Sequence, residues 1–284
     1  MATSEAAGKI GVSESLPGAT KSAKAGAVTI RKCEALEQMQ ACFALQKEVW
    51  RFSDAELIPV RLFVVANKIG GQVIGAFDES GEKPELVGFA LAIPGMRSGH
   101  PYLHSQMLAV HPLCRNEGLG RRMKLFQRSD ALGRGFELME WTFDPLEIKN
   151  SYLNIEKLGA IARRYNVNQY GITSSPLQGG LPSDRLIAEW WLRSKRVEAL
   201  LEGTPPQAWE CRARIEVPAE IYAWKADAAT RAKALEVQRR NRALMSAAFA
   251  QGFSALGYER DAHGNGRFLL GVWDENWQYS QAVL

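Results

Sequence analysis

Residues 107–129 read MLAVHPLCRNEGLGRRMKLFQRS, and this stretch decides the fold. An apolar strand ends near Val110, a polar loop with two glycines follows, and a helix begins near Leu119. The first amide protons of a helix have no partner inside the helix and carry partial positive charge, so this junction is suited to binding a phosphate group. Gly118 and Gly120 permit the close backbone approach and the left-handed angles that such a cradle needs.

Positive charge is concentrated around this junction. Between residues 115 and 134 there are six basic and two acidic side chains, and the difference of +4 equals the net charge of the whole chain. These are Arg115, Arg121, Arg122, Lys124, Arg128 and Arg134 against Glu117 and Asp130. We therefore expect a positive field beside the cradle, where a polyanionic ligand would bind. The small overall charge argues against bulk nucleic-acid binding, so no nucleic-acid partner is predicted.

Hydrophobic periodicity places strands and helices on both sides of the junction. Strands are predicted at 28–33, 62–67, 72–77, 86–93, 102–110, 138–143, 162–169, 186–192, 209–217 and 268–273, and helices at 34–50, 119–132, 146–158, 197–201 and 227–253. The order of strand, loop, helix and strand across residues 102–143 implies a parallel crossover. The predicted fold class is α/β (α+β), with a mixed central sheet.

Composition divides the chain into three parts. Residues 1–27 are rich in Ala, Gly, Ser, Thr and Lys and have no aromatic side chain, which predicts a disordered tail. Residues 28–175 form the ligand-binding domain around the junction. Residues 176–284 are interpreted as a C-terminal α/β extension packed on the same sheet.

The rest of the composition restricts the function classes. The chain is 46% hydrophobic and 23% charged, with no run of about 20 apolar residues. No membrane segment or signal peptide is therefore predicted. The four cysteines form no CxxC pair and lie near no histidine cluster, which favours reduced thiols, a cytoplasmic location and no metal site.

The hexapeptide Arg115–Gly120, RNEGLG, resembles the pyrophosphate motif R/Q-x-x-G-x-G/A of the GNAT acetyltransferase superfamily. The preceding LAVHP at 108–112 is similar to the strand ending of that family, and IEKLG at 155–159 resembles its Y-E-K-L-G helix end. From residue 179 onward the sequence resembles an uncharacterised branch with an extension. The rival dinucleotide fold requires an early G-x-G-x-x-G with an acidic residue about 20 positions later, and the chain has neither.

The resemblance implies a mostly antiparallel sheet and an acyl-CoA-dependent N-acyltransferase. Acetyl-CoA is the default donor, and its thioester would lie in a splayed gap between strands 102–110 and 138–143. The backbone of Leu108 and Val110 would bind the pantetheine arm, and a strand amide would polarise the thioester carbonyl. The pyrophosphate would be held by the amides of Arg115, Asn116, Glu117, Gly118, Leu119, Gly120 and Arg121.

Three residues are candidates for proton transfer. By the strand period of two, His104 shares a face with Leu108 and Val110, where it could act as a base or be a half-exposed structural histidine. Glu140 on the facing strand is a second candidate base or a solvent-facing position. The tyrosine that many family members use as an acid aligns with Ile155, and Tyr152, one turn earlier, could substitute for it. Catalysis by proximity without an acid is the alternative.

Acceptor recognition is assigned to polar residues after this helix. The candidates are Tyr165, Asn168, Asp184 and Arg185, which could equally serve as loop turns and a sheet edge. The acceptor is predicted to be an amine of a small molecule or peptide. Two other functions stay open: a non-catalytic acyl-CoA-binding module, and an interaction protein that uses the 227–253 helix. The acceptor, the acyl chain and the oligomeric state, including a homo-oligomer, do not follow from the sequence.

Overall fold

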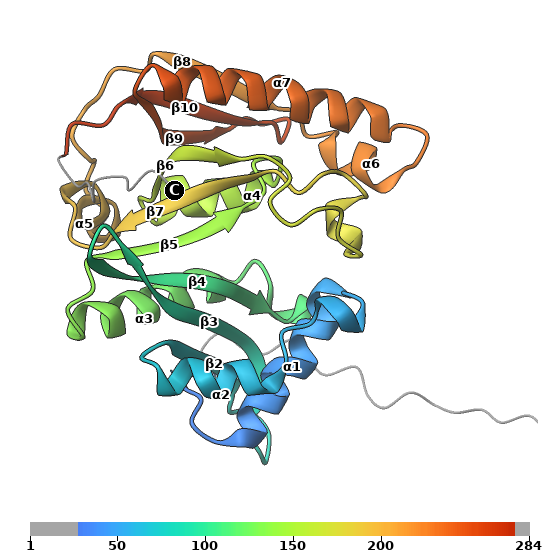
Figure 1. The fold of residues 1–284 in the computed structure, drawn as a ribbon, viewed down its shortest axis with the longest axis vertical. Helices are drawn as coiled ribbons and strands as arrows, with labels where there is room; N and C mark the ends of the chain where they lie inside the picture. The colour runs from blue at the N-terminus through green and yellow to red at the C-terminus, as the bar shows by residue number, and fades with distance from the viewer. Residues whose placement is uncertain (1–27, 276–284) are drawn as a thin grey trace, which may run out of the picture.

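The computed structural model describes residues 28–275, so the predicted tail over residues 1–27 lies outside the described part of the chain. A ten-stranded sheet runs through it in the order β1-β2-β3-β4-β5-β7-β6-β9-β10-β8 (Figure 1). The strands are β1 (Val28–Lys32), β2 (Gln72–Asp78), β3 (Glu85–Arg97), β4 (His100–Val110), β5 (Leu138–Phe143), β6 (Ile161–Asn166), β7 (Arg185–Trp191), β8 (Ala213–Val217), β9 (Phe253–Arg260) and β10 (Gly266–Val272).

Seven α-helices flank the described sheet. They are α1 (Leu36–Trp50), α2 (Val60–Lys68), α3 (Leu119–Gly133), α4 (Ile148–Ser151), α5 (Lys195–Glu202), α6 (Ile221–Ala226) and α7 (Arg231–Ala250). A π-helical turn over Tyr152–Lys157 continues α4. Every strand pairing in the sheet for which a register is recorded is antiparallel except that of β4 with β5. The predicted mixed, mostly antiparallel fold class is confirmed.

Two predicted elements were wrong. Residues 62–67, predicted as a strand, lie in helix α2, where Phe63 and Ala66 are buried. A short apolar run fits a buried helix as well as a strand, and here Pro59 precedes the first turn. The predicted long helix over 227–253 is divided between α7 and the start of β9, a strand that periodicity missed.

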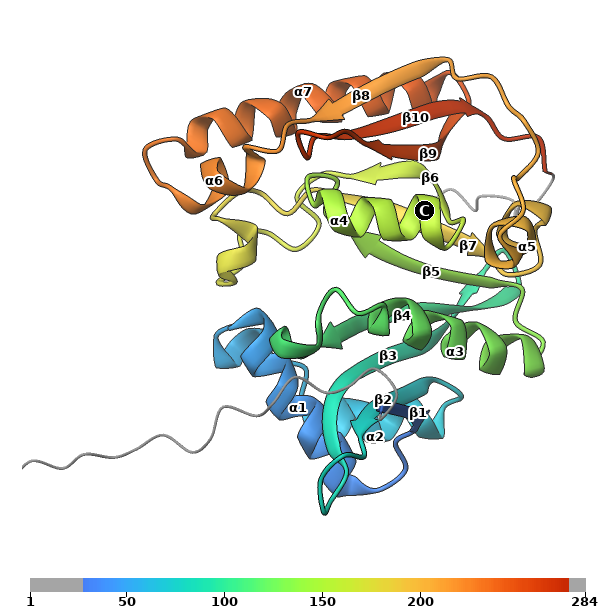
Figure 2. The same cartoon turned by 180° about the vertical axis from the view of Figure 1, so that it is seen from behind.

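Helices cover the two faces of the sheet around β4 differently. Met39 of α1 and Phe63 of α2 pack with Phe89 and Met107 on one face, called here the α1/α2 face. Helices α3 and α4 lie on the opposite face, called the α3/α4 face, which Figure 2 shows toward the viewer. Any residue of β4 therefore faces either the α1/α2 helices or the α3/α4 helices.

The C-terminal part extends the same sheet rather than forming a second one. Strands β9, β10 and β8 add beyond β6, and α7 packs along β6, β8 and β9. Strand β7, which begins at Arg185, lies between β5 and β6. The division predicted at residue 175 therefore falls between two neighbouring strands of the sheet, in the loop that joins β6 to β7.

Candidate functional site

The site is organised by a seam, the line along which β4 and β5 run side by side. The two parallel strands pair only at Leu103↔Met139 and His104↔Glu140. Beyond these pairs β4 continues to Val110 and β5 to Phe143, and no further register between them is found in residues 28–275. Their backbone groups on this side are thus left without the hydrogen bonds that a continuous sheet would supply.

The backbone of β4 beyond the last pair presents alternate residues to the seam. The amide of His111 donates to the carbonyl of Val87 on β3 at 2.8 Å, so His111 and Ala109 are directed toward β3. Leu108 and Val110 are then directed toward the seam. Arg115 supports this, because its Nε donates to the Val110 carbonyl at 3.1 Å. These are the two residues for which the sequence predicted backbone contacts.

Helix α3 begins next to this open edge. Its N-cap, Gly118, has φ 77°, and an added Cβ would meet no atom within 4 Å. The first intrahelical bond runs from the Arg122 amide to the Gly118 carbonyl at 3.0 Å. The amides of Leu119, Gly120 and Arg121 have no acceptor recorded among the described residues. These three amides can therefore receive an anion.

The basic side chains do not all gather at this loop. Arg122 donates to the Val28 carbonyl at 2.7 Å, and Arg128 to the Leu192 carbonyl at 2.6 Å. Arg134, at the far end of α3, pairs with Asp130 at 2.7 Å. The expected positive field is therefore spread along the helix, and Arg115 and Arg121 are the residues that border the cradle.

A β-bulge at Gln106 changes the face on which His104 lies. The register on β3 moves from Leu91↔Met107 directly to Ala92↔Ser105, so β4 carries one extra residue. Ser105 contacts Lys124 of α3, and Leu108 borders Gly120 of α3, so both face α3. His104 consequently lies on the α1/α2 face, and the prediction that it shares a face with Leu108 was wrong.

His104 is half-buried on the α1/α2 face. Burial lowers its pKa, and the positive charges of Lys124 and Arg164 lower it further. The imidazole is therefore neutral at neutral pH and able to accept a proton. Its partner in the register with β5 is Glu140.

Glu140 is occupied by two arginines. Its carboxylate receives Arg97 Nη2 at 2.6 Å and Arg164 Nη2 at 2.5 Å. Burial raises the pKa of Glu140, against the opposing pull of the two guanidinium groups. Because Arg97 comes from β3 and Arg164 from β6, the carboxylate connects the strands on both sides of the seam. This arrangement suits a structural ion pair better than the base that the sequence suggested.

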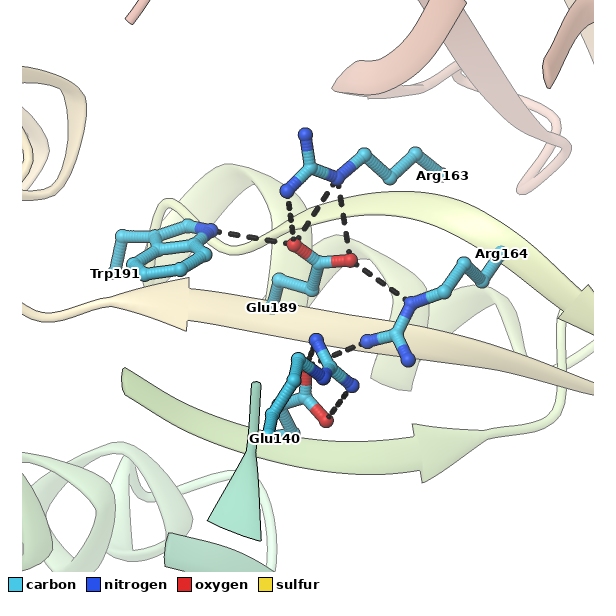
Figure 3. Close-up of polar contacts among 6 residues, drawn as sticks. Glu140, Arg163, Arg164, Glu189 and Trp191 are labelled. Carbon is cyan, nitrogen blue, oxygen red and sulfur yellow. Dashed lines mark hydrogen bonds and ion pairs between the residues drawn. The ribbon is translucent and has the colours of Figure 1, made fainter. Parts of the chain in front are cut away.

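The same network continues to Glu189 on β7 (Figure 3). Arg163 Nη2 donates to Glu189 at 2.8 Å and Arg164 Nε at 3.0 Å. Two consecutive arginines reach one carboxylate because the β6 register shifts between Ala162 and Tyr165. Burial alone would raise the pKa of Glu189, but Arg163 and Arg164 hold it below its usual value.

Lys124 lies on the α3/α4 face, on the other side of the sheet from the Glu140 and Glu189 network. Its ammonium group donates to Ser105 Oγ at 2.8 Å and lies 3.7 Å from the ring centroid of Trp141. The side chain is 4% exposed, and no ion pair of Lys124 is found among residues 28–275. Burial lowers its pKa from 10.5 to about 7. The sequence assigned this residue only to the general positive field.

Tyr152 is turned toward the C-terminal strands. Its ring lies 5.7 Å from the guanidinium of Arg260 on β9 and 5.1 Å from Lys157 Nζ. Strands β7 and β6 separate β9 from β5. Ile155, which the sequence resemblance aligned with a tyrosine, is fully buried. Within residues 28–275, no contact places Tyr152 at the seam.

The four predicted acceptor residues do come together, but around a buried carboxylate. Asp184 is 0% exposed and accepts from Tyr165 Oη at 2.7 Å and from the Asn168 amide at 3.0 Å. Arg242 of α7 donates to both of its oxygens, at 2.8 and 2.9 Å. Arg185 donates to the Asp184 carbonyl at 2.9 Å. The cluster thus anchors the β6–β7 loop to the C-terminal extension.

Two loops meet on the α1/α2 side of the seam, a contact that sequence reasoning missed. Ser174 Oγ in the β6–β7 loop accepts from the Ser53 amide at 2.8 Å, and Ser175 Oγ donates to the Trp50 carbonyl at 2.8 Å. Tyr170 Oη lies 3.0 Å from Thr142 Oγ1 on β5. Polar loop composition was the available signal, but it does not specify which distant loop is the partner.

No group of His, Cys, Asp and Glu able to hold a metal ion occurs within 28–275. Within the same residues, none of the helices combines the length and the apolar composition that a membrane span requires. All four cysteines are free thiols.

Comparisons with known proteins give structural matches only. No family profile matches the chain, and no curated protein does. The ribosomal-protein-S18-alanine N-acetyltransferase from Escherichia coli is 16% identical, with a TM-score of 0.46 over 59% of this chain and 95% of its own. Arabidopsis thaliana NAA60 with a bisubstrate analogue is 13% identical, with a TM-score of 0.48 over 58% and 98%. The NatC complex bound to Gag peptide and CoA is 14% identical, with a TM-score of 0.45 over 57% and 96%. The likeness to these structures is one of fold, over a little more than half of this chain.

Proposed function

We propose that this chain is an acyl-CoA-dependent N-acyltransferase, with acetyl-CoA as the donor and an amine of a small molecule or peptide as the acceptor. The observation that carries the proposal is the start of α3 beside the unpaired edge of β4. The amides of Leu119, Gly120 and Arg121 would hold the pyrophosphate, with Arg115, Asn116, Glu117 and Gly118 shaping the loop. Asn116 and Gly118 both have positive φ, as a cradle of backbone amides requires.

The donor's pantetheine arm would follow the seam. Leu108 and Val110 present backbone groups there that replace the missing pairing with β5. A thioester in this position places its carbonyl near backbone amides of β4, which stabilise the negative charge that develops on its oxygen. The bulge at Gln106 makes this part of β4 irregular and so exposes amides that a regular ladder would use.

The acceptor would approach from the α1/α2 face. His104 lies on that face and is neutral at neutral pH, so it can take the proton that the attacking amine loses. The loops that meet through Ser53 and Ser174 border the same side. Direct attack in a ternary complex fits this arrangement, because donor and acceptor would reach the seam from different sides. Glu140 and Tyr152 have no part in this proposal, since their contacts engage them elsewhere.

Binding of acetyl-CoA is the first test, and α3 supplies a matched pair of variants. Gly118 and Gly135 flank opposite ends of the helix with φ 77° and 81°, and both have open space around an added Cβ. Gly118→Ala and Gly135→Ala should therefore cost similar stability, about 1 kcal/mol each. By isothermal titration, Gly118→Ala should weaken acetyl-CoA binding about tenfold and Gly135→Ala should leave it unchanged. Absence of binding by the wild type would refute the proposal.

Catalysis is tested by release of free CoA thiol across a library of amines. His104→Ala should lower the amine-dependent rate by about 10²-fold or more. His111→Ala is the control, because His111 Nε2 is engaged by Glu48 at 2.8 Å outside the seam. The second candidate function, a non-catalytic acyl-CoA-binding module, is favoured by the engagement of Glu140 with arginines. It would be supported by tight binding with no amine-dependent thiol release.

A further inference from the structure

A buried lysine lies where the seam begins. Ser105 and Trp141 are the residues that directly follow the last paired residues, His104 on β4 and Glu140 on β5. Lys124 contacts both, through a 2.8 Å hydrogen bond to Ser105 and a 3.7 Å approach to the Trp141 ring. Its ammonium group therefore lies on the α3/α4 face at the closed end of the seam, which is the end where β4 and β5 are still paired.

Among the residues that the structure describes, none is a counterion to Lys124. A buried charge is costly unless it is paired, and a hydroxyl and an aromatic face compensate only in part. The Ser105 hydroxyl that accepts from Lys124 donates in turn to Oε1 of neighbouring Gln127 at 3.2 Å. The nearby carboxylates Glu140 and Glu189 lie on the opposite face and are taken by Arg97, Arg163 and Arg164. The site is therefore complementary to an anion that residues 28–275 do not supply.

We propose that Lys124 is the proton donor to the CoA sulfur that leaves during acyl transfer, an inference that rests on the proposed function. A pantetheine arm that follows Val110 and Leu108 toward the last paired residues reaches Lys124 at the end of the seam. His104 is on the opposite face of β4, so the two proton-transferring groups approach the reacting centre from different sides. Tyr152 cannot compete for this role while its ring is packed on Arg260.

The proton inventory of the step balances. The amine nitrogen forms a bond to the thioester carbon and loses one proton to His104, and the C–S bond breaks with its electron pair going to sulfur. Lys124 gives one proton to that thiolate and becomes a neutral amine. Proton return from His104 to Lys124 through solvent restores both groups. Burial lowers the pKa of Lys124 to about 7, which favours this donation at neutral pH.

The test measures the ionisation of the bound CoA thiol, which needs no acceptor. CoA is titrated with pH in complex with wild type, Lys124→Met and Lys124→Gln, and the thiolate is followed by its ultraviolet absorbance. Arg128→Met is the matched control, since Arg128 lies one turn further along α3 and binds the Leu192 carbonyl. Thiolate and ammonium stabilise each other and titrate as a pair, so the thiolate should appear about one to two pH units lower in the wild type and the control than in both Lys124 variants.

Activity gives the second measurement. With any amine that supports turnover, Lys124→Met should lower kcat by about 10²-fold, leave the affinity for CoA within about threefold, and remove the fall in kcat on the alkaline side of the pH profile. Identical thiol pKa values in wild type and both variants would overturn the inference while leaving the proposed function intact. Failure of the wild type to bind CoA at all would instead refute the proposed function, and this inference with it.

Discussion

The two faces of the sheet at the closed end of the seam handle positive charge in opposite ways. On the α1/α2 face, three arginines surround two buried carboxylates, and each carboxylate accepts from two guanidinium groups. On the α3/α4 face, Lys124 is more deeply buried than any of those arginines and has a hydroxyl and an indole ring as its neighbours. The faces are separated only by the thickness of β4 and β5.

The difference distinguishes arginines whose ion pairs stabilise the fold from Lys124, whose charge is suited to pairing with a ligand. The arginine–glutamate network links β3, β5, β6 and β7. It therefore connects the part of the sheet formed by β1–β4 with the part that begins at β5, where β4 and β5 share only two pairs. Removing either carboxylate would leave buried cations uncompensated. Lys124 is compensated only in part, so the folded chain bears a cost at this position that a bound anion would offset.

The largest effect expected from this contrast is a gain of stability on removing Lys124. The folded protein holds this lysine with a pKa of about 7 against 10.5 when unfolded. Between these values the unfolded chain binds more protons, so wild-type stability rises with pH across that window. At about 1.4 kcal/mol per pH unit, the penalty is about 5 kcal/mol at pH 6 and about 2 kcal/mol at pH 9.

Urea unfolding of Lys124→Met at both pH values measures this penalty. The variant should be the more stable protein at pH 6, by up to about 5 kcal/mol, and its advantage should shrink toward pH 9. Arg128→Met should show no such dependence, because its guanidinium stays charged throughout. A Lys124→Met protein that is less stable than wild type at pH 6 would mean that Ser105 and Trp141 compensate the charge fully.

The parts of this site that are formed by residues adjacent in the sequence could be predicted from the sequence. The cradle at Arg115–Gly120 is a contiguous strand, loop and helix start, and its glycines and helix signals are all local. The predicted strand 138–143 agrees with β5 residue for residue. What failed depends on pairing between distant strands. The bulge at Gln106 reverses the face of His104, and nothing in the β4 sequence alone fixes that register.

The dependence on pairing between distant strands also explains why the contacts of the charged residues could not be predicted. A shift in the β6 register brings Arg163 and Arg164 to one carboxylate, and two adjacent arginines in a sequence carry no sign of it. Asp184 looked like a loop residue because its partner, Arg242, lies 58 positions further along the chain. Lys124 did leave a local signal, because it is a charged residue on the buried face of α3, next to Met123 and Gln127. Helical periodicity alone is enough to recognise a charged residue at such a position.

Breaking the network on the α1/α2 face should have the next largest effect, with the opposite sign. Glu189→Gln keeps the shape of the side chain but removes the Glu189 carboxylate from Arg163 and leaves Arg164 with Glu140. Loss of one partner of a buried pair costs about 3 kcal/mol or more, so the variant should unfold at clearly lower urea concentration at pH 7. Glu216→Gln is the control: this side chain is 64% exposed and pairs with Arg267 on the surface, so the loss should stay below about 1 kcal/mol. Equal losses in the two variants would show that the buried network contributes no more than a surface pair.

The smallest effect expected is that of Arg97→Met, which removes one of the two arginines bound to Glu140. Arg164 remains, and the Arg97 side chain is 20% exposed, so about 1 to 2 kcal/mol of stability should be lost at pH 7. The pKa of Glu140 is already raised by burial and should rise further in the variant. The folded variant then binds more protons than wild type, so its deficit should shrink as the pH falls and Glu140 becomes protonated. Arg267→Met, at 39% exposure, provides the surface comparison. A deficit that stays constant on acidification would show that Arg97 acts by packing on Tyr102 rather than through the Glu140 carboxylate.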